Sequence, residues 1–168
     1  MAMNLTNIMT DAQKASASVL ETCMMLCIEA HYGQRDRNGL PYCLHPIRVS
    51  NSVPTIRAKS LALIHDAVED GPIGILEKMQ KLLPYDLVQS VLLLSRVEGE
   101  SYANYIERVA TQGGVDELLV KLADLKDNSD ISRMDDNARK MSIERYHPAY
   151  DRIVEALKKK GPAHIPIV

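Results

Sequence analysis

The residues best suited to catalysis in this chain are the ionisable groups clustered in the segment 61–70. His65 and Asp66 are adjacent, and Glu69 follows the histidine by four positions. Asp70 follows Asp66 by four, so at helical spacing all these groups share one turn. Ionisable groups beside a strongly apolar run are costly unless something offsets their charge, as a bound cation does. The segment therefore suggests a metal site, and the alternative is a solvated helix end.

Two other segments contribute residues of the same chemical types. His45 precedes a proline, where a helix can start. Asp124 lies in a predicted helix, and Asn128 follows one turn later on the same face. Two imidazoles and two carboxylates form a mixed nitrogen and oxygen set, which suits manganese, iron, cobalt or zinc better than magnesium. We therefore expect the fold to bring four metal ligands together: His45, His65, Asp66 and Asp124.

These blocks resemble the hydrolase domain of RelA/SpoT-type alarmone enzymes and their small stand-alone relatives, which are HD-domain phosphohydrolases. The resemblance covers about residues 31–150 and rests on three motifs in this order: Gly39-x-Pro41-Tyr42-x-x-His45-Pro46, His65-Asp66-x-x-Glu69-Asp70 and Lys121-Leu122-Ala123-Asp124-x-x-x-Asn128. A lone His-Asp pair would be weak evidence, but the three blocks together are specific. The resemblance implies an all-α HD-domain bundle with manganese as the metal.

The resemblance also implies a reaction, the removal of the 3′-pyrophosphate from guanosine tetra- and pentaphosphate (ppGpp and pppGpp). Its catalytic pair would be Glu69 and Asp70. A divalent ion can lower the pKa of a bound water and hold a phosphate oxygen as a Lewis acid. Glu69, one turn from the metal pair, is placed to accept a proton from that water or to orient it. Asp70 would share this task or support it.

The substrate of such an enzyme is a small nucleotide whose pyrophosphate needs cations around it. Basic residues occur in and after the matching blocks: Arg35, Arg37, Arg48, Lys121, Arg133, Arg139 and Arg145. Among them we favour Arg37 and Lys121, because their segments flank the metal blocks. By resemblance, Asn128 would bond the ribose and Tyr146 would line the nucleotide pocket.

One position departs from the family. Its loop usually carries two neighbouring basic residues before the Gly-x-Pro-Tyr motif, whereas this chain has Asp36-Arg37. An acid there could repel phosphate or alter base selection. An alternative substrate is therefore another nucleotide or a dinucleotide phosphate such as NADPH. A second alternative, of a different class, is a catalytically silent module that binds metal or nucleotide.

The composition is that of an ordinary globular protein, and 168 residues suit one domain spanning positions 1–168. A net charge of −2 and a pI near 6.2 argue against a general nucleic-acid binder. No apolar run approaches the roughly 20 residues of a membrane span, and the N-terminus lacks a signal-peptide core. We therefore expect a cytoplasmic location. The sequence leaves a homo-oligomer open.

Helical periodicity without sustained period-2 alternation predicts an all-α bundle. The first helix begins at a Thr10-x-x-Gln13 capping box. We expect helices over about these residues: 10–31, 45–52, 55–70, 75–83, 87–94, 102–112, 116–131 and 137–159.

The cysteines allow two interpretations. Cys23 and Cys27 are one helical turn apart and could bind zinc together with histidines. They also fit an apolar helix face shared with Met24 and Ile28, where they would be reduced core residues, and we favour this second interpretation.

Overall fold

Side-chain caps set the start of several helices. In the computed structural model, which describes residues 10–130, 140 and 142–161, Thr10, Thr55 and Ser101 each cap a helix. Each accepts a hydrogen bond from the backbone N–H three residues later. Such an acceptor satisfies one of the free N–H groups of the first turn. Thr10 also forms the predicted capping box with Gln13.

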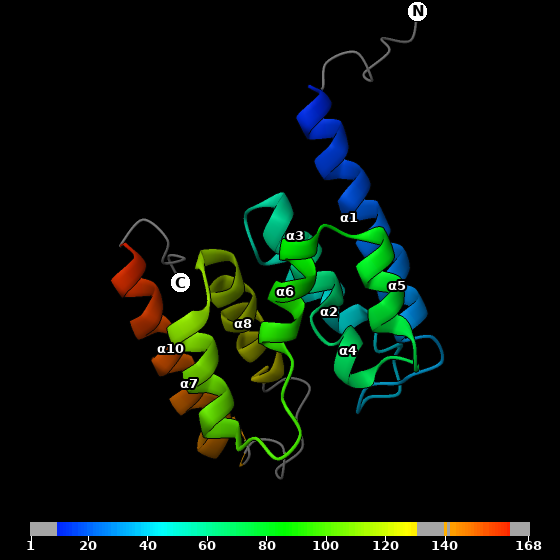
Figure 1. The fold of residues 1–168 in the computed structure, drawn as a ribbon. Coiled ribbons are helices and arrows are strands. Elements are labelled where there is room, and N and C mark those ends of the chain that lie inside the picture. The colour runs from blue at the N-terminus through cyan, green and yellow to red at the C-terminus, as the bar shows by residue number, and fades with distance from the viewer. Residues whose placement is uncertain (1–9, 131–139, 141, 162–168) are drawn as a thin grey trace, which may run out of the picture.

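The described residues form an all-α bundle, as predicted (Figure 1). Its helices are α1 (Asp11–Ala30), α2 (Leu44–Asn51), α3 (Ile56–Ile64), α4 (Ala67–Asp70), α5 (Ile75–Leu82), α6 (Tyr85–Leu94), α7 (Tyr102–Gln112), α8 (Val115–Asn128) and α10 (His147–Lys160). A π-helical turn, η3 (Ser142–Tyr146), leads directly into α10. No β-strand occurs in the described part of the chain, where Arg35 and Pro41 form an isolated bridge.

Helix α3 lies at the centre of the bundle. Its residues from Ser60 to Ile64 are all buried, and it packs against α1, α2, α6 and α8. Residues 61–64 are apolar in an unbroken run, as expected for a helical segment buried on all sides, whereas the first turns of α3 carry the partly exposed Arg57 and Lys59. Helices α7 and α10 pack together at one edge of the bundle, while α1 and α5 lie at the opposite edge (Figure 1). Helix α8 joins the two parts, because it contacts both α3 and α10.

The helix predicted over residues 55–70 is in fact two helices. α3 ends at Ile64, His65 and Asp66 form a turn, and the short α4 begins at Ala67. Nδ1 of His65 lies 2.8 Å from the carbonyl oxygen of Ala62. In an unbroken helix this carbonyl accepts from the N–H four residues later, that of Asp66. The imidazole competes for that acceptor where the helix ends.

The buried face of α1 differs in part from the predicted one. Cys23 and Cys27 are buried in the core, and burial raises the pKa of each thiol to about 12. The prediction that they are core residues is confirmed, and both are free cysteines in the structure. Met24 and Ile28, predicted on the same face, are 48% and 54% exposed. The buried face of α1 is narrower than predicted. It consists of Cys23, Leu26, Cys27 and Ala30.

None of the helices formed by the described residues combines the length and apolar character that crossing a lipid bilayer requires.

Candidate active site

The side chains predicted to bind metal converge where α2, the α3–α4 turn and α8 meet. Nε2 of His45 lies 3.5 Å from Oδ2 of Asp66 and 3.3 Å from Oδ1 of Asp124. Nε2 of His65 lies 3.1 Å from Oδ1 of Asp66 and 3.6 Å from Oδ1 of Asp124. His45, His65 and Asp124 are buried, and they offer ligand atoms that all lie within 4.8 Å of one another. This buried group could hold a metal ion.

Both imidazoles direct the nitrogen that a metal needs toward this cluster. Nδ1 of His65 faces the carbonyl oxygen of Ala62, and Nδ1 of His45 lies 2.7 Å from Oδ2 of Asp127. An oxygen acceptor at Nδ1 keeps a proton there and leaves the lone pair of Nε2 for a metal. Nε2 of His65 is buried and makes no hydrogen bond in the structure, even though Oδ1 of Asp66 lies 3.1 Å away. Since a buried polar atom without a partner is costly, the residues fit a divalent cation.

Charges within the cluster oppose the effect of burial. Burial lowers the pKa of His45, but hydrogen bonds and charges from Asp124, Asp127 and Asp66 outweigh it and raise that pKa to about 10. The pKa of His65 is raised by the same balance between burial and its neighbouring aspartates. Burial alone would raise the pKa of Asp124. Lys121 and the two imidazoles outweigh burial and hold this pKa well below its ordinary value. A metal ion would therefore compete with protons for the imidazole nitrogens.

Two of the predicted substrate contacts, Lys121 and Asn128, both bind Asp124. Nζ of Lys121 lies 2.7 Å from Oδ2 of Asp124, and Nδ2 of Asn128 donates to Oδ1 at 2.5 Å. Lys121 is buried, and its Nζ lies 4.8 Å from the ring centre of Tyr105. Both side chains therefore hold the carboxylate of a proposed ligand while they also line the pocket.

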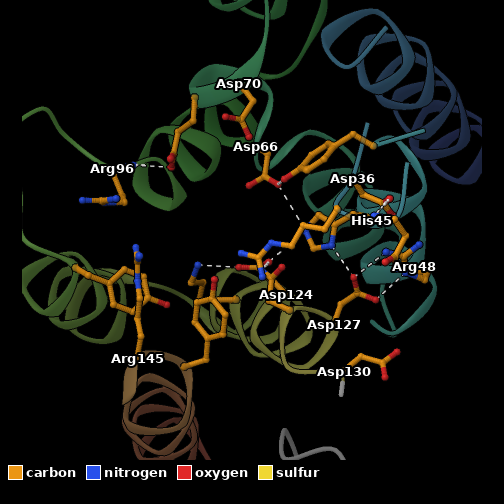
Figure 2. Close-up of a pocket in the computed structure, with 18 of the residues that line it drawn as sticks. Asp36, His45, Arg48, Asp66, Asp70, Arg96, Asp124, Asp127, Asp130 and Arg145 are labelled. Atoms are coloured by element: carbon orange, nitrogen blue, oxygen red, sulfur yellow. Dashed lines mark hydrogen bonds and ion pairs between the residues drawn. The ribbon is translucent and has the colours of Figure 1, made fainter. Parts of the chain in front are cut away.

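A pocket of about 400 Å³ opens over this cluster, a volume typical of small-molecule sites. Its lining includes all the predicted substrate-binding and catalytic residues: Arg37, Lys121, Asn128, Tyr146, Glu69 and Asp70. Four further cations that line it are Arg35, Arg48, Arg96 and Arg145. Figure 2 shows Arg96 and Arg145 across the pocket from Arg48. Arg133 and Arg139 lie outside the described residues.

Glu69 and Asp70 are exposed on the wall of this pocket. Oε1 of Glu69 accepts a hydrogen bond from the backbone N–H of Arg96 at 2.8 Å. The carbonyl oxygen of Asp70 accepts from Nε2 of Gln34 at 2.6 Å. Partial loss of hydration raises the pKa of both carboxyl groups; the Arg96 N–H opposes this for Glu69, and the charge of Asp66 adds to it for both. A raised carboxyl pKa favours proton transfer near neutral pH.

Three contacts in the site were not predicted. The hydroxyl of Tyr42 donates to Oδ2 of Asp66 at 2.8 Å, Asp127 contacts His45, and Arg96 holds Glu69. Helical spacing could have indicated Asp127, which follows a proposed ligand by one turn. No sequence pattern marks Arg96, because its contact depends on how the loop after α6 folds.

The acid that departs from the family's basic loop organises that loop. Oδ1 of Asp36 accepts hydrogen bonds from the backbone N–H groups of Asn38 and Leu40, each at 2.9 Å. Such side-chain-to-backbone bonds are typical of aspartate in turns. Asp36 also lines the pocket, so its charge faces the ligand space even though backbone donors stabilise it.

No model of a known protein family matches the sequence. The structure, however, is similar to that of a metazoan ortholog of SpoT that hydrolyses ppGpp and plays a role in starvation responses. The two superpose with a TM-score of 0.62 at 22% sequence identity. The match covers 86% of this chain and 96% of the other. The fold predicted from the sequence motifs is thereby confirmed.

Proposed function

We propose that this chain, which has an HD-type alarmone-hydrolase-like fold, is a metal-dependent hydrolase of the 3′-pyrophosphate of ppGpp and pppGpp. Its products would be pyrophosphate with GDP or GTP, respectively. The observation that carries the proposal is the meeting of two imidazoles and two aspartates beneath a pocket lined with carboxylates and cations. The activity of the structurally similar SpoT ortholog supports the choice of substrate.

The metal in this proposal is Mn²⁺, held by His45, His65, Asp66 and Asp124. A mixed set of nitrogen and oxygen donors suits this ion. When bound, such an ion acts as a Lewis acid toward a phosphate oxygen and makes nearby water more acidic.

Glu69 is the proton acceptor of the proposed reaction. The Arg96 N–H holds one carboxylate oxygen, Oε1, which leaves Oε2 to receive a proton from the attacking water. The oxygen of that water forms a bond to the phosphorus next to the ribose, and the bond from this phosphorus to the 3′ oxygen breaks. The 3′ oxygen takes a proton from solvent and leaves as a hydroxyl, while Glu69 later releases its proton to solvent, so intact pyrophosphate is released. Asp70 supports Glu69 from the same wall of the pocket.

The cations of the pocket bind the substrate. A ppGpp molecule carries diphosphates at two ends of its ribose, and basic residues lie on both sides of the aspartate cluster (Figure 2), with Arg96 and Arg145 on one side and Arg48 on the other. Arg37 is exposed on the loop before α2 and can reach a phosphate without losing a structural contact described for it. Asn128 and Tyr146 would contact the nucleoside, since both line the same pocket.

The test is a product assay with purified, Mn²⁺-loaded protein and three separate substrates: ppGpp, GTP and NADPH. We expect equal amounts of GDP and pyrophosphate from ppGpp, without orthophosphate. Asp124→Asn serves as the control, because a neutral amide replaces a charged ligand and metal content should fall. Intact ppGpp together with phosphate release from NADPH would overturn the substrate. Turnover of none of the three by metal-loaded protein would favour a binding module.

A further inference from the structure

Asp127 lies behind His45, on the side of the ring opposite the aspartate cluster. Its Oδ2 is 2.7 Å from Nδ1 of the imidazole, whereas Nε2 of the same ring faces Asp66 and Asp124. The two ends of one imidazole are therefore contacted by different carboxylates (Figure 2).

Arg48 fixes the carboxylate of Asp127. Its Nε donates to Oδ1 at 2.8 Å, and its Nη2 donates to Oδ2 at 3.0 Å. A two-point contact between guanidinium and carboxylate sets the plane of the carboxylate as well as its position. A lysine could supply the charge but not this geometry. Oδ2 of Asp127 is thus shared between the guanidinium and His45.

Helical spacing brings the three residues together. Arg48 follows His45 by three positions on α2, and Asp127 follows Asp124 by three positions on α8. Residues three apart lie on the same face of a helix. Helix α8 therefore supplies one proposed ligand, Asp124, and the contact that holds another.

We propose that Asp127 and Arg48 form a positioning pair for His45. Asp127 sets the rotation of the ring and keeps a proton on Nδ1, so that Nε2 offers its lone pair to the metal. Arg48 holds the Asp127 carboxylate in the orientation that this contact needs. The inference rests on the proposed function in one respect, since it takes His45 as a metal ligand.

The contact between Asp127 and His45 is buried, so a single substitution of Asp127 should have a measurable effect. The side chain of His45 is 6% exposed and that of Asp127 is 12% exposed, so water competes little for their contact. An asparagine at position 127 can still accept through its oxygen. It can also present its NH₂ group to Nδ1, which favours the proton on Nε2, the wrong nitrogen for a metal.

The first test is Mn²⁺ affinity, measured by calorimetry on the full chain without nucleotide. We expect Asp127→Asn to weaken binding by about 10- to 100-fold, the usual scale for losing a residue that orients a metal ligand. Arg48→Gln should weaken it less, and Arg48→Lys should fall between Arg48→Gln and the wild type.

A matched control is available in a second two-point pair. Glu107 on α7 binds Arg152 on α10, with Oε2 to Nε at 2.7 Å and Oε1 to Nη2 at 2.8 Å. Neither residue lines the pocket. Glu107→Gln removes an equivalent charge and should leave Mn²⁺ affinity unchanged. Wild-type affinity in both Asp127→Asn and Arg48→Gln would overturn the positioning role, as would an equal loss in Glu107→Gln.

A second measurement separates this inference from the proposed function. In protein without added metal, the Nδ1 proton of His45 should give a slowly exchanging ¹H signal coupled to ¹⁵N, and Asp127→Ala should abolish it. Persistence of the signal in that variant overturns the inference, whether or not the wild type binds metal. If Asp127→Ala does not fold, the exchange rate of this proton in Arg48→Gln decides instead, with faster exchange expected. Absence of ppGpp turnover by a wild type that still binds Mn²⁺ would contradict only the proposed function.

Discussion

Lys121 and the two imidazoles contact opposite oxygens of Asp124. Nζ of Lys121 lies 2.7 Å from Oδ2, whereas Nε2 of His45 and of His65 lie 3.3 Å and 3.6 Å from Oδ1. The buried ammonium therefore reduces the negative charge of the cluster from the side away from the proposed metal. Its absence should make the cluster more costly to bury and more attractive to a cation.

Lys121→Met should separate these two effects. We expect the variant to lose about 3 kcal/mol of unfolding free energy without metal, the scale for breaking a buried ion pair from one side. Saturating Mn²⁺ should raise its melting temperature more than it raises that of the wild type, because a ligand stabilises the folded state by RT ln(1 + [L]/Kd) and a tighter Kd therefore gives the larger rise. Thermal melts with and without Mn²⁺ measure both. An equal Mn²⁺-induced rise in the two proteins would contradict the prediction.

Glu69→Gln should keep the metal and lose catalysis. The amide oxygen of glutamine can still accept from the Arg96 N–H, so the wall of the pocket should persist. The amide cannot take a proton from water, and we expect kcat to fall about 10²-fold or more. Metal analysis alongside steady-state kinetics checks this. A metal-bound variant that turns over at the wild-type rate would show that Glu69 is only a surface residue.

The acidic limb of the pH profile should lie above the range of an ordinary glutamate. Partial loss of hydration raises the pKa of Glu69, and a base works only when deprotonated. As the pH falls through this raised pKa, kcat/KM should fall about tenfold per pH unit. The limb should be missing from the residual activity of Glu69→Gln. The same limb at the same pH in both proteins would assign it to another group.

Two substitutions at Asp36 separate its role in holding the loop backbone from the effect of its negative charge on the substrate. Asp36→Asn keeps an oxygen for the Asn38 and Leu40 N–H groups, whereas Asp36→Ala removes it. We expect the alanine variant to raise KM about fivefold, equivalent to about 1 kcal/mol for a lost hydrogen bond. The asparagine variant should leave KM unchanged or lower it, since a negative charge facing phosphate is removed. Equal effects of the two substitutions would contradict a role in organising the loop.

The ion pair between Glu100 and Arg108 should make stability depend on pH. Arg108 donates to Oε1 at 2.8 Å and to Oε2 at 2.7 Å, which lowers the pKa of Glu100 to about 2. The pair therefore stabilises fully above the ordinary glutamate pKa, and this contribution is lost as the pH falls toward 2. Glu100→Gln should be less stable than the wild type by about 1.5 kcal/mol at pH 7.

Urea unfolding at pH 7 and at pH 3 measures this difference. The two proteins should become more alike at the lower pH. A difference that does not change with pH would assign the effect of the substitution to packing.

The sequence predicted the helical class and most helix boundaries, because caps and apolar periodicity are local signals. Thr10 is an example, since it forms with Gln13 the predicted capping box that begins α1. The candidate site residues came from their chemical types and the family resemblance, and the structure brings them to one pocket. The break at His65 and Asp66 was missed, because local periodicity continues through it and only the contacts of the two side chains reveal it. The partner of Asp127 also depends on how α2 crosses α8, and no local pattern specifies that crossing.

Helix α8 carries four polar residues of the site within about two turns and on one face: Lys121, Asp124, Asp127 and Asn128. An α-helix turns by about 100° per residue. Each of these side chains can be exchanged singly, but a one-residue insertion before Lys121 within α8 would rotate all of them away from the pocket together. Among natural variants that keep this site, we expect substitutions in α8 and constant spacing between its four polar positions. Length changes should be confined to the loops at its ends.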